Sequence, residues 1–241
     1  MLISFQAQQL RFASILWINS RWFMERGINI NDDSARQRVS NWLLGEFGYA
    51  IPLQGDPKEA FAEQVKTLYA DRYGGSTGRS RHGGSGRVAT AGCYQAKGIG
   101  ITPLAGAGSE WAHSHGCASL EESVREAIFA EVAAAEFPFG AVPVIAILDT
   151  GLYFSELTAA SADSQKMRRA IIVRPAVLRP AHAERAPLFL RSLIGCANSQ
   201  SADVQRTKDV IHRWVTQDTR QPQSEDFSVP TLKDLVQRIA E

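Results

Sequence analysis

The sequence predicts an α+β fold, because capped amphipathic helices, short β-branched runs and a long glycine-rich stretch follow one another along the chain. Of its 241 residues 44% are hydrophobic, enough to bury a substantial core as one large domain or two small ones. Its 26 lysines and arginines nearly balance 25 aspartates and glutamates. This near-neutral charge argues against electrostatic capture by nucleic acid or by an acidic membrane surface.

The N-terminal segment contains a short apolar run, FASILWI at 12–18, and no acidic residue before Glu25. The run is shorter than the roughly 18 apolar residues that span a membrane. No small-residue cleavage site follows it, so a secretory signal is not indicated. We therefore expect an ordinary N-terminal helix here, in preference to a transit peptide.

Two further helices are expected before residue 73. NDDSARQRVSNWLLGEFG offers Asp32 or Asp33 as an N-cap, and its apolar spacing predicts a helix over about 34–45. In GDPKEAFAEQVKTLYADRYGG, Asp56 would cap a helix that has Pro57 at its first position and an apolar stripe behind it. Residues 1–73 are accordingly predicted to form an N-terminal helical region.

Residues 74–109 are rich in glycine, and a third capped helix follows them. Ser119 with Glu122 three residues later forms a capping box, which begins a helix over 119–137. After its first turn and a half this helix is apolar nearly all round. We therefore expect much of it to be buried.

Two apolar, β-branched runs follow that helix, VPVIAILDTG at 142–151 and RRAIIVRP at 168–175. Their short length and their Pro, Gly and charged boundaries predict strands of a sheet that is covered on both faces. Between them we expect a polar loop over 155–167. The tail from about residue 188 alternates helical stretches with a polar linker.

The order of these elements has a chemical meaning. A glycine-rich turn lets backbone N–H groups approach phosphate, and a lysine on the next strand can neutralise phosphate charge. A carboxylate on the following helix can hold that lysine in place, as in protein kinases. Here the turn is followed by Lys97 and then by Glu126. Taken alone, glycine-rich stretches are more often flexible connectors, and a lysine such as Lys97 is more often a solvated surface residue.

Four segments add a family resemblance: GGSGRV (83–88), KGIGITPL (97–104), HGCASLEESVREAIFAE (115–131) and VRPAVLRPAHAE (173–184). They resemble, in order, the GDGRA loop, the KGAGxTP strand, the DGRAxLRSSIRE helix and the RVAPSHxRFGHFE segment of the selenoprotein O family. The members of this family are kinase-like proteins that transfer AMP from ATP to protein hydroxyls. The match covers roughly residues 70–190.

The resemblance implies a protein-kinase-like N-terminal lobe, a small sheet plus a buried helix, with flanking helices. The nucleotide-binding lobe would span 74–190, after the helical region of 1–73, and 191–241 would begin an incomplete helical C-terminal lobe. The implied activity is transfer of AMP to Ser, Thr or Tyr hydroxyls, with ATP and Mg²⁺ as cofactors and proteins as substrates. Together with the charge balance, it predicts neither a nucleic acid nor a membrane as partner.

The resemblance also assigns site residues. The residues expected to hold ATP are Gly84, Gly86, Arg87, Lys97, His115, Gly116, Arg174 and Arg179. Glu126 would be the ion-pair partner of Lys97. Arg174 and Arg179 would bind the outer phosphates, because the family holds ATP in a flipped orientation that presents the α-phosphate to the acceptor hydroxyl.

The chain departs from the family pattern at several points. His115 stands where the family has an Asp, about six extra residues precede the helix, and the Arg174–Arg179 spacing is two residues shorter. The family's metal ligands and base lie in HGVMNTDN and DYGP motifs, which are lacking here, whereas PTLKDLVQRIAE (230–241) resembles the helix before them. No metal ligand is therefore assigned, and the catalytic residues are expected beyond residue 241. These features predict a fragment or a decayed copy.

Other functions fit parts of the sequence. A pseudokinase-like, non-catalytic ATP-binding module would keep the phosphate contacts without the metal ligands. RYGGSTGRSRHGGSGR (72–87) interleaves arginine with glycine as RNA-binding segments do, although few aromatic residues accompany it. HSHGC (113–117) could join Cys93 and Cys196 in a zinc site, but the spacing fits no common pattern.

The cysteines bear on location. Cys93, Cys117 and Cys196 are odd in number, widely spaced and in no CxxC pair. This usage predicts free thiols in a reducing compartment, and hence a cytoplasmic protein.

Overall fold

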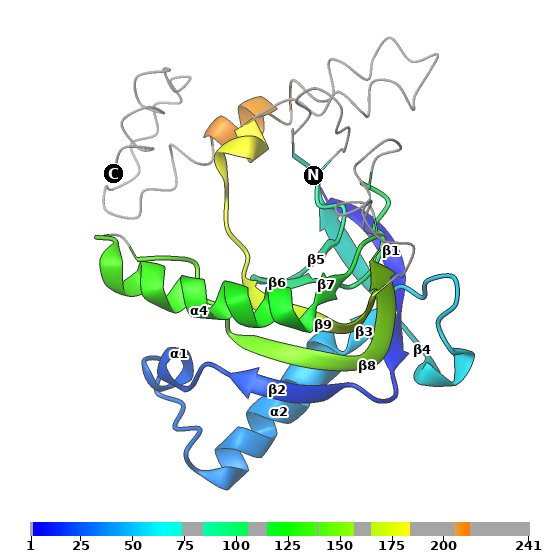
Figure 1. The fold of residues 1–241 in the computed structure, drawn as a ribbon. Helices are drawn as coiled ribbons and strands as arrows, with labels where there is room; N and C mark the ends of the chain where they lie inside the picture. Colours follow the sequence, from blue (N-terminus) through cyan, green and yellow to red (C-terminus); the bar gives the residue numbers. More distant parts are fainter. Residues whose placement is uncertain are drawn as a thin grey trace.

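The computed structural model describes residues 2–73, 84–105, 115–138, 140–156, 165–183, 205 and 207–212. These residues form a mixed α+β fold around one nine-stranded antiparallel sheet (Figure 1), so the predicted α+β class is confirmed. In chain order the elements are β1 (Leu2–Leu10), β2 (Ser14–Ile18), α1 (Ser20–Met24), α2 (Asp33–Phe47), β3 (Tyr49–Ala50), η1 (Lys58–Ala60), β4 (Phe61–Asp71), β5 (Val88–Ala91), β6 (Tyr94–Lys97), β7 (Ala118–Ser119), α4 (Leu120–Glu136), β8 (Ala146–Glu156), β9 (Gln165–Pro175) and η2 (Pro180–Ala183).

The sheet joins distant parts of the chain. Its strand order is β2-β8-β9-β6-β5-β4-β1-β3, and β7 pairs with β9 off this path. The N-terminal strands β1 and β4 pair from Leu2 opposite Asp71 to Leu10 opposite Phe61. β4 then pairs with β5 through Tyr69 opposite Thr90. Strands from the first 73 residues and strands from the later segments therefore belong to one sheet.

The helical character expected of residues 1–73 is wrong over much of that range. The expected N-terminal helix is replaced by β1 and β2, and the expected helix after Asp56 is a single 3-10 turn, η1, followed by β4. The local helix signals were overridden because β4 gains backbone pairing with β1 along nearly all of its length. Such pairing over 60 residues of sequence leaves no local signature.

Asp56 does not cap a helix. Its carboxylate accepts a hydrogen bond from the Leu53 N–H at 2.8 Å and pairs with the Arg169 guanidinium at 3.3 Å. The Arg169 side chain is completely buried, and its Nε also donates to the Gly98 carbonyl oxygen at 3.4 Å. This buried pair ties the loop before β4 to the centre of the sheet.

The two other capped helices are confirmed. α2 begins after Asp32, whose carboxylate accepts hydrogen bonds from the N–H groups of Ser34 and Ala35. α4 begins after Ser119, whose Oγ accepts from the Glu122 N–H at 3.0 Å. In both cases the sequence signal was local, which explains why it was sufficient.

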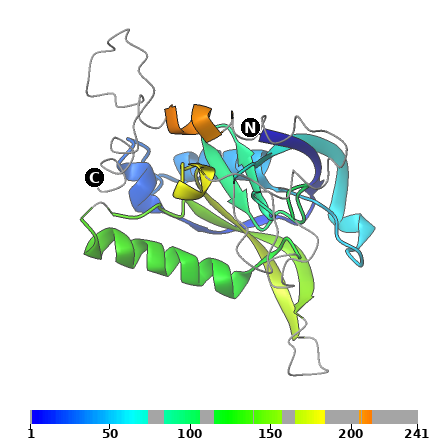
Figure 2. The same ribbon diagram turned by 90° about the horizontal axis from the view of Figure 1, so that it is seen from above.

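The two helices cover opposite faces of the sheet, as Figure 2 shows. Ile171 and Val173 of β9 pack with the α2 side of the core, whereas Ala170 and Ile172 pack beneath α4. Successive residues of a strand point to opposite faces, so one apolar strand serves both cores. The expectation that the β8 and β9 segments form strands covered on both faces is confirmed.

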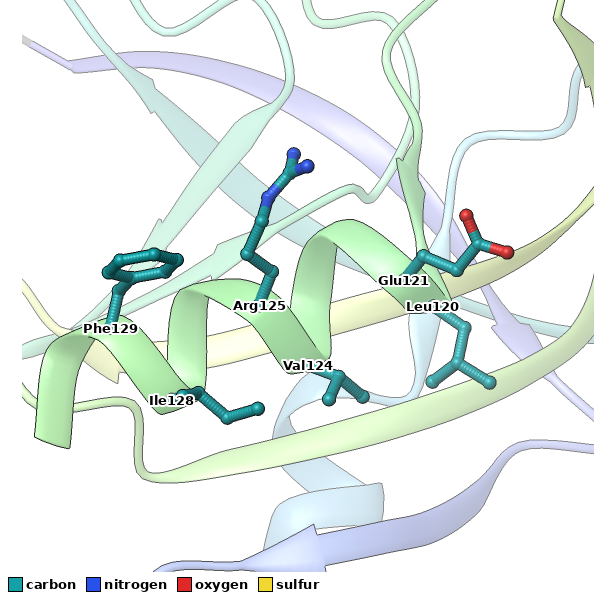
Figure 3. A pocket seen from close by; sticks show the side chains of 6 residues that line it. All are labelled: Leu120, Glu121, Val124, Arg125, Ile128 and Phe129. Atoms are coloured by element: carbon teal, nitrogen blue, oxygen red, sulfur yellow. The ribbon is translucent and has the colours of Figure 1, made fainter. Parts of the chain in front are cut away.

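The expected burial of α4 is wrong for its outer face. Ile128 is 57% exposed and Phe129 is 64% exposed, whereas Ser123 and Ala127 on the inner face are buried. A pocket of about 410 Å³ lies on the outer face (Figure 3). Its lining residues are Leu120, Glu121, Val124, Arg125, Ile128 and Phe129. The apolar residues all round this helix could be buried on either face. Among the described residues, however, the sheet packs against the helix, and it covers the inner face only.

The tail after residue 183 is described only at 205 and 207–212, which are helical, as expected for that stretch. The remainder of the proposed C-terminal lobe, 191–241, lies outside the described residues. Within the described part of the chain, no helix is both long and apolar enough to cross a membrane.

Candidate functional site

The register between β6 and β9 brings two cationic side chains to one face of the sheet. Lys97 lies opposite Ile172, and Gln95 lies opposite Arg174. Because side chains alternate along a strand, Lys97 and Arg174 share the face on which Ile172 packs beneath α4. The Lys97 side chain is 9% exposed and that of Arg174 is 19% exposed. Burial at this level requires partners for both charges.

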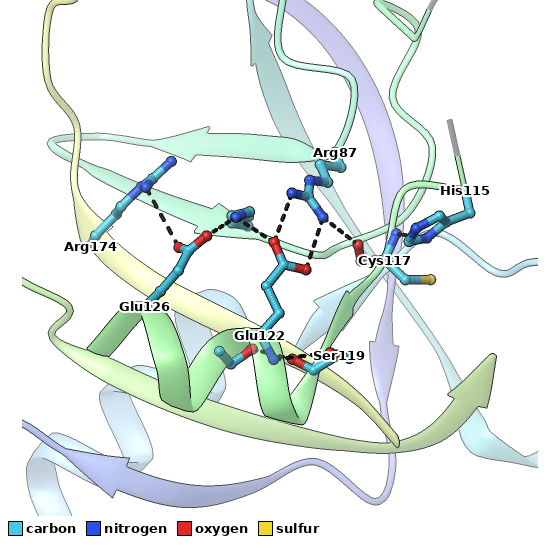
Figure 4. A network of polar contacts seen from close by, with 9 residues as sticks. Arg87, His115, Cys117, Ser119, Glu122, Glu126 and Arg174 are labelled. Atoms are coloured by element: carbon cyan, nitrogen blue, oxygen red, sulfur yellow. Dashed lines mark hydrogen bonds and ion pairs between the residues drawn. The ribbon is translucent and has the colours of Figure 1, made fainter. Parts of the chain in front are cut away.

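α4 supplies two carboxylates to this face. Glu122 and Glu126 are four residues apart, so they project from the same side of the helix. Lys97 Nζ lies 2.8 Å from Glu122 Oε1 and forms a second ion pair with Glu126 Oε1. Arg174 Nη1 lies 4.0 Å from the other oxygen of Glu126. Figure 4 shows the two carboxylates side by side above α4, with Arg174 beyond Glu126.

Arg87, directly before β5, completes the network at its other end. Its Nη2 donates to Glu122 Oε1 at 2.8 Å and its Nη1 donates to Oε2 at 3.1 Å, which is a bidentate pair. Nη1 also donates to the Cys117 carbonyl oxygen at 2.9 Å. Arg87 is therefore fixed both to α4 and to the turn that precedes it.

The positive charges of Arg174 and Arg179 are the least neutralised by nearby carboxylates in the site. Burial, followed by the positive charge of Arg179, holds the pKa of Arg174 below its ordinary value. The buried Nε of Arg174 has no hydrogen-bond partner among the described residues. Arg179 donates from Nη2 to Gln95 Oε1 at 3.4 Å, and its guanidinium lies 6.0 Å from the ring centre of Tyr73.

The network carries an excess of positive charge. Four cations, Arg87, Lys97, Arg174 and Arg179, stand against two carboxylates, so the formal excess is two. Burial acts to raise the pKa of Glu122, but the hydrogen bond from Lys97 and the charges of Arg87 and Lys97 outweigh it and lower the pKa. Glu122 is therefore ionised at neutral pH. The excess of positive charge remains, and it favours the binding of an anion.

The predicted glycine loop is described from Gly84 onward. Residues 74–83 lie outside the described part of the chain, but Arg72 and Gly84 form a β-bridge beside them. Gly84 has a φ of +141°, and a Cβ there would lie 2.3 Å from the Asp71 carbonyl oxygen, so glycine is required. Gly86 accepts a hydrogen bond from the Thr102 N–H at 3.0 Å, and a Cβ there would make only ordinary contacts.

His115 and Gly116 lie on the turn before β7. His115 Nδ1 accepts a hydrogen bond from the Cys117 N–H at 3.0 Å, and its ring stacks on Phe154 at 4.9 Å. Gly116, with φ of +75°, would place a Cβ 2.2 Å from the Gly100 carbonyl carbon, so close backbone packing explains this glycine. Cys117 is buried, and burial raises its thiol pKa to about 11.

The structure brings together four of the residues assigned from the sequence, Arg87, Lys97, Glu126 and Arg174, with Arg179 next to them. Whether these residues bind a nucleotide stays a prediction. Glu122 was missed, because it was given only a capping role. Its carboxylate instead faces Lys97 and Arg87, and the i,i+4 spacing of Glu122 and Glu126 was the available signal.

The two alternative binding sites fall partly outside the described residues. Of the arginine-glycine segment, Arg72 is 6% exposed and Arg87 is paired with Glu122, so neither presents its guanidinium on an open surface. Among the described residues, no group of three or more His, Cys, Asp or Glu could hold a metal ion. His113 and Cys196 of the zinc hypothesis lie outside that set.

Comparison with known proteins gives this chain no family by similarity: no family model matches it, and no curated protein matches it with significant similarity.

Proposed function

We propose that the described residues form the ATP-binding lobe of a kinase-like protein AMP transferase of the selenoprotein O type. The observation that carries this proposal is the ion pair of Lys97 with Glu126. Counting β4 as the first strand, the lysine lies on the third, β6. The glutamate lies on α4, the next helix along the chain. Kinase-like lobes use this lysine–glutamate pair to position the lysine against phosphates.

The residues present fit a polyphosphate. The formal excess of two positive charges and the unpartnered Nε of Arg174 both favour an anionic ligand beside the network. Lys97 would contribute a point charge and Arg174 a planar fork, the two kinds of donor by which proteins bind phosphate. In AMP transfer, a protein hydroxyl attacks the α-phosphorus, pyrophosphate leaves, and the hydroxyl proton passes to a base.

The described residues do not fit the Mg²⁺ that this reaction uses. Both carboxylates of the network are engaged by cations: Glu122 by Arg87 and Lys97, and Glu126 by Lys97 and Arg174. No step is therefore assigned to a metal held by these residues. This engagement favours a second candidate function, a non-catalytic ATP-binding module.

The proposal is tested by calorimetric titration of the intact chain with ATP. Lys97→Ala and Arg174→Ala should each weaken binding by about 1 to 3 kcal/mol, because each removes a charge-assisted contact with phosphate. Lys66→Ala and Arg36→Ala are the matched controls, since Lys66 pairs with Glu46 away from the network and Arg36 is exposed on α2. Equal affinity in wild type and both site variants would contradict the proposal.

ATP labelled at the α-phosphate tests this chain for AMP transfer. Covalent label on a protein hydroxyl would favour the transferase over the non-catalytic module, whereas reversible binding without label is expected both of that module and of a transferase lobe whose catalytic residues lie elsewhere.

A further inference from the structure

The guanidinium of Arg87 and the ammonium of Lys97 hold one carboxylate between them. Glu122 accepts from Arg87 at 2.8 and 3.1 Å and from Lys97 at 2.8 Å. A planar guanidinium fork beside an ammonium is also a donor set that binds phosphate oxygens. Glu122 therefore occupies donors that an anionic ligand of this site would use.

The carboxylate of Glu122 is not required to begin its helix. The capping contact of α4 uses the Glu122 N–H, which donates to Ser119 Oγ at 3.0 Å. The carboxylate takes no part in this contact. Both cations also keep a partner without it. Arg87 retains the carbonyl oxygen of Cys117 at 2.9 Å, and Lys97 retains Glu126. Departure of Glu122 would thus leave the two donors in place.

We propose that Glu122 is a built-in competitor of the phosphate ligand: its carboxylate occupies Arg87 and Lys97 in the free protein, and incoming phosphates displace it. This inference rests on the proposed function and adds regulation to the same site. The displaced side chain turns toward solvent, to which 22% of it is already exposed. The competition lowers the affinity of every anion that must displace Glu122 by the same factor.

The test is calorimetric titration of the intact chain with inorganic tripolyphosphate and with ATP. Glu122→Gln should bind both probes about tenfold more tightly than wild type, the scale of one charge-assisted hydrogen bond released for the ligand. Glu121→Gln is the matched control, because Glu121 is an exposed neighbour on the same turn and its loss changes net charge equally. Its affinity should stay within about twofold of wild type.

Unchanged or weaker binding by Glu122→Gln would overturn the inference, because the carboxylate would then position Arg87 and Lys97 instead of competing for them. Should Glu122→Gln fail to fold, Glu122→Ala is measured, with the same direction expected. ATP binding that depends on Lys97 but does not tighten in these variants would overturn this inference alone. ATP binding indifferent to Lys97, or no binding of either probe by any variant, would overturn the proposed function as well.

Discussion

The two faces of α4 differ in composition and in surroundings. The inner face combines small buried residues, Ser123 and Ala127, with the carboxylates Glu122 and Glu126, which reach Lys97 on β6. The outer face carries large apolar side chains that are about half exposed, among them Ile128. The small residues let the helix approach the sheet closely enough for ion pairs. The face of this helix that carries Glu122 and Glu126, and not its apolar face, therefore faces the candidate site.

The largest expected effect comes from removing both inner carboxylates. The double variant Glu122→Ala/Glu126→Ala should lower the free energy of unfolding by about 3 to 5 kcal/mol, because it leaves Lys97 buried without an anionic partner. Glu126→Ala alone should cost clearly less, since Glu122 still pairs with Lys97. Urea unfolding of the two single variants and the double variant measures this coupling. Strictly additive effects would contradict the shared network.

A matched pair of isoleucines tests the apolar side of the comparison. Ile172→Ala should cost about 2 to 4 kcal/mol, because Ile172 is fully buried between β9 and α4. Ile128→Ala on the outer face should change stability by less than about 0.5 kcal/mol, since Ile128 is 57% exposed and alanine favours helix. Both values come from urea unfolding. Equal losses at the two positions would mean that something covers the outer face.

The smallest expected effect is a pH dependence caused by Glu122. Its pKa lies below the ordinary value of 4.5, so ionised Glu122 stabilises the fold above that pH, and the contribution disappears as pH falls through the lowered pKa. Glu122→Gln should therefore be less stable than wild type by about 1 kcal/mol at pH 7. The gap should close between pH 5 and acid unfolding. A gap that is constant with pH would contradict this assignment.

The sequence predicted the helices that are specified locally and missed β1, β2 and β4, which are specified by pairing with distant strands. Asp32 and Ser119 mark the starts of α2 and α4, because a cap acts on the next three residues. The residues of β4 carry helix signals of the same kind, but pairing with β1 outweighs them. No local pattern near β4 contains information about β1.

The same distinction explains the site. Lys97 and Glu126 were paired in the prediction through their order in the family motifs, whereas Glu122 was assigned to a local capping box. Only its N–H makes the capping contact. Its carboxylate accepts hydrogen bonds from Arg87 and Lys97, which lie 35 and 25 residues away in the sequence and are brought close by the sheet. The outer face of α4 was misjudged because apolar composition alone does not say which sides meet a partner.

Lys97 is the central residue of the proposed ATP site. An acyl-phosphate derivative of ATP transfers its acyl group to a lysine amine beside the bound phosphates and releases ATP, and mass spectrometry locates the modified residue. We expect Lys97 to be acylated in the intact chain and excess ATP to protect it, while exposed lysines such as Lys58 react slowly and without protection. Acylation confined to other lysines, or acylation of Lys97 that ATP does not reduce, would contradict an ATP site at Lys97.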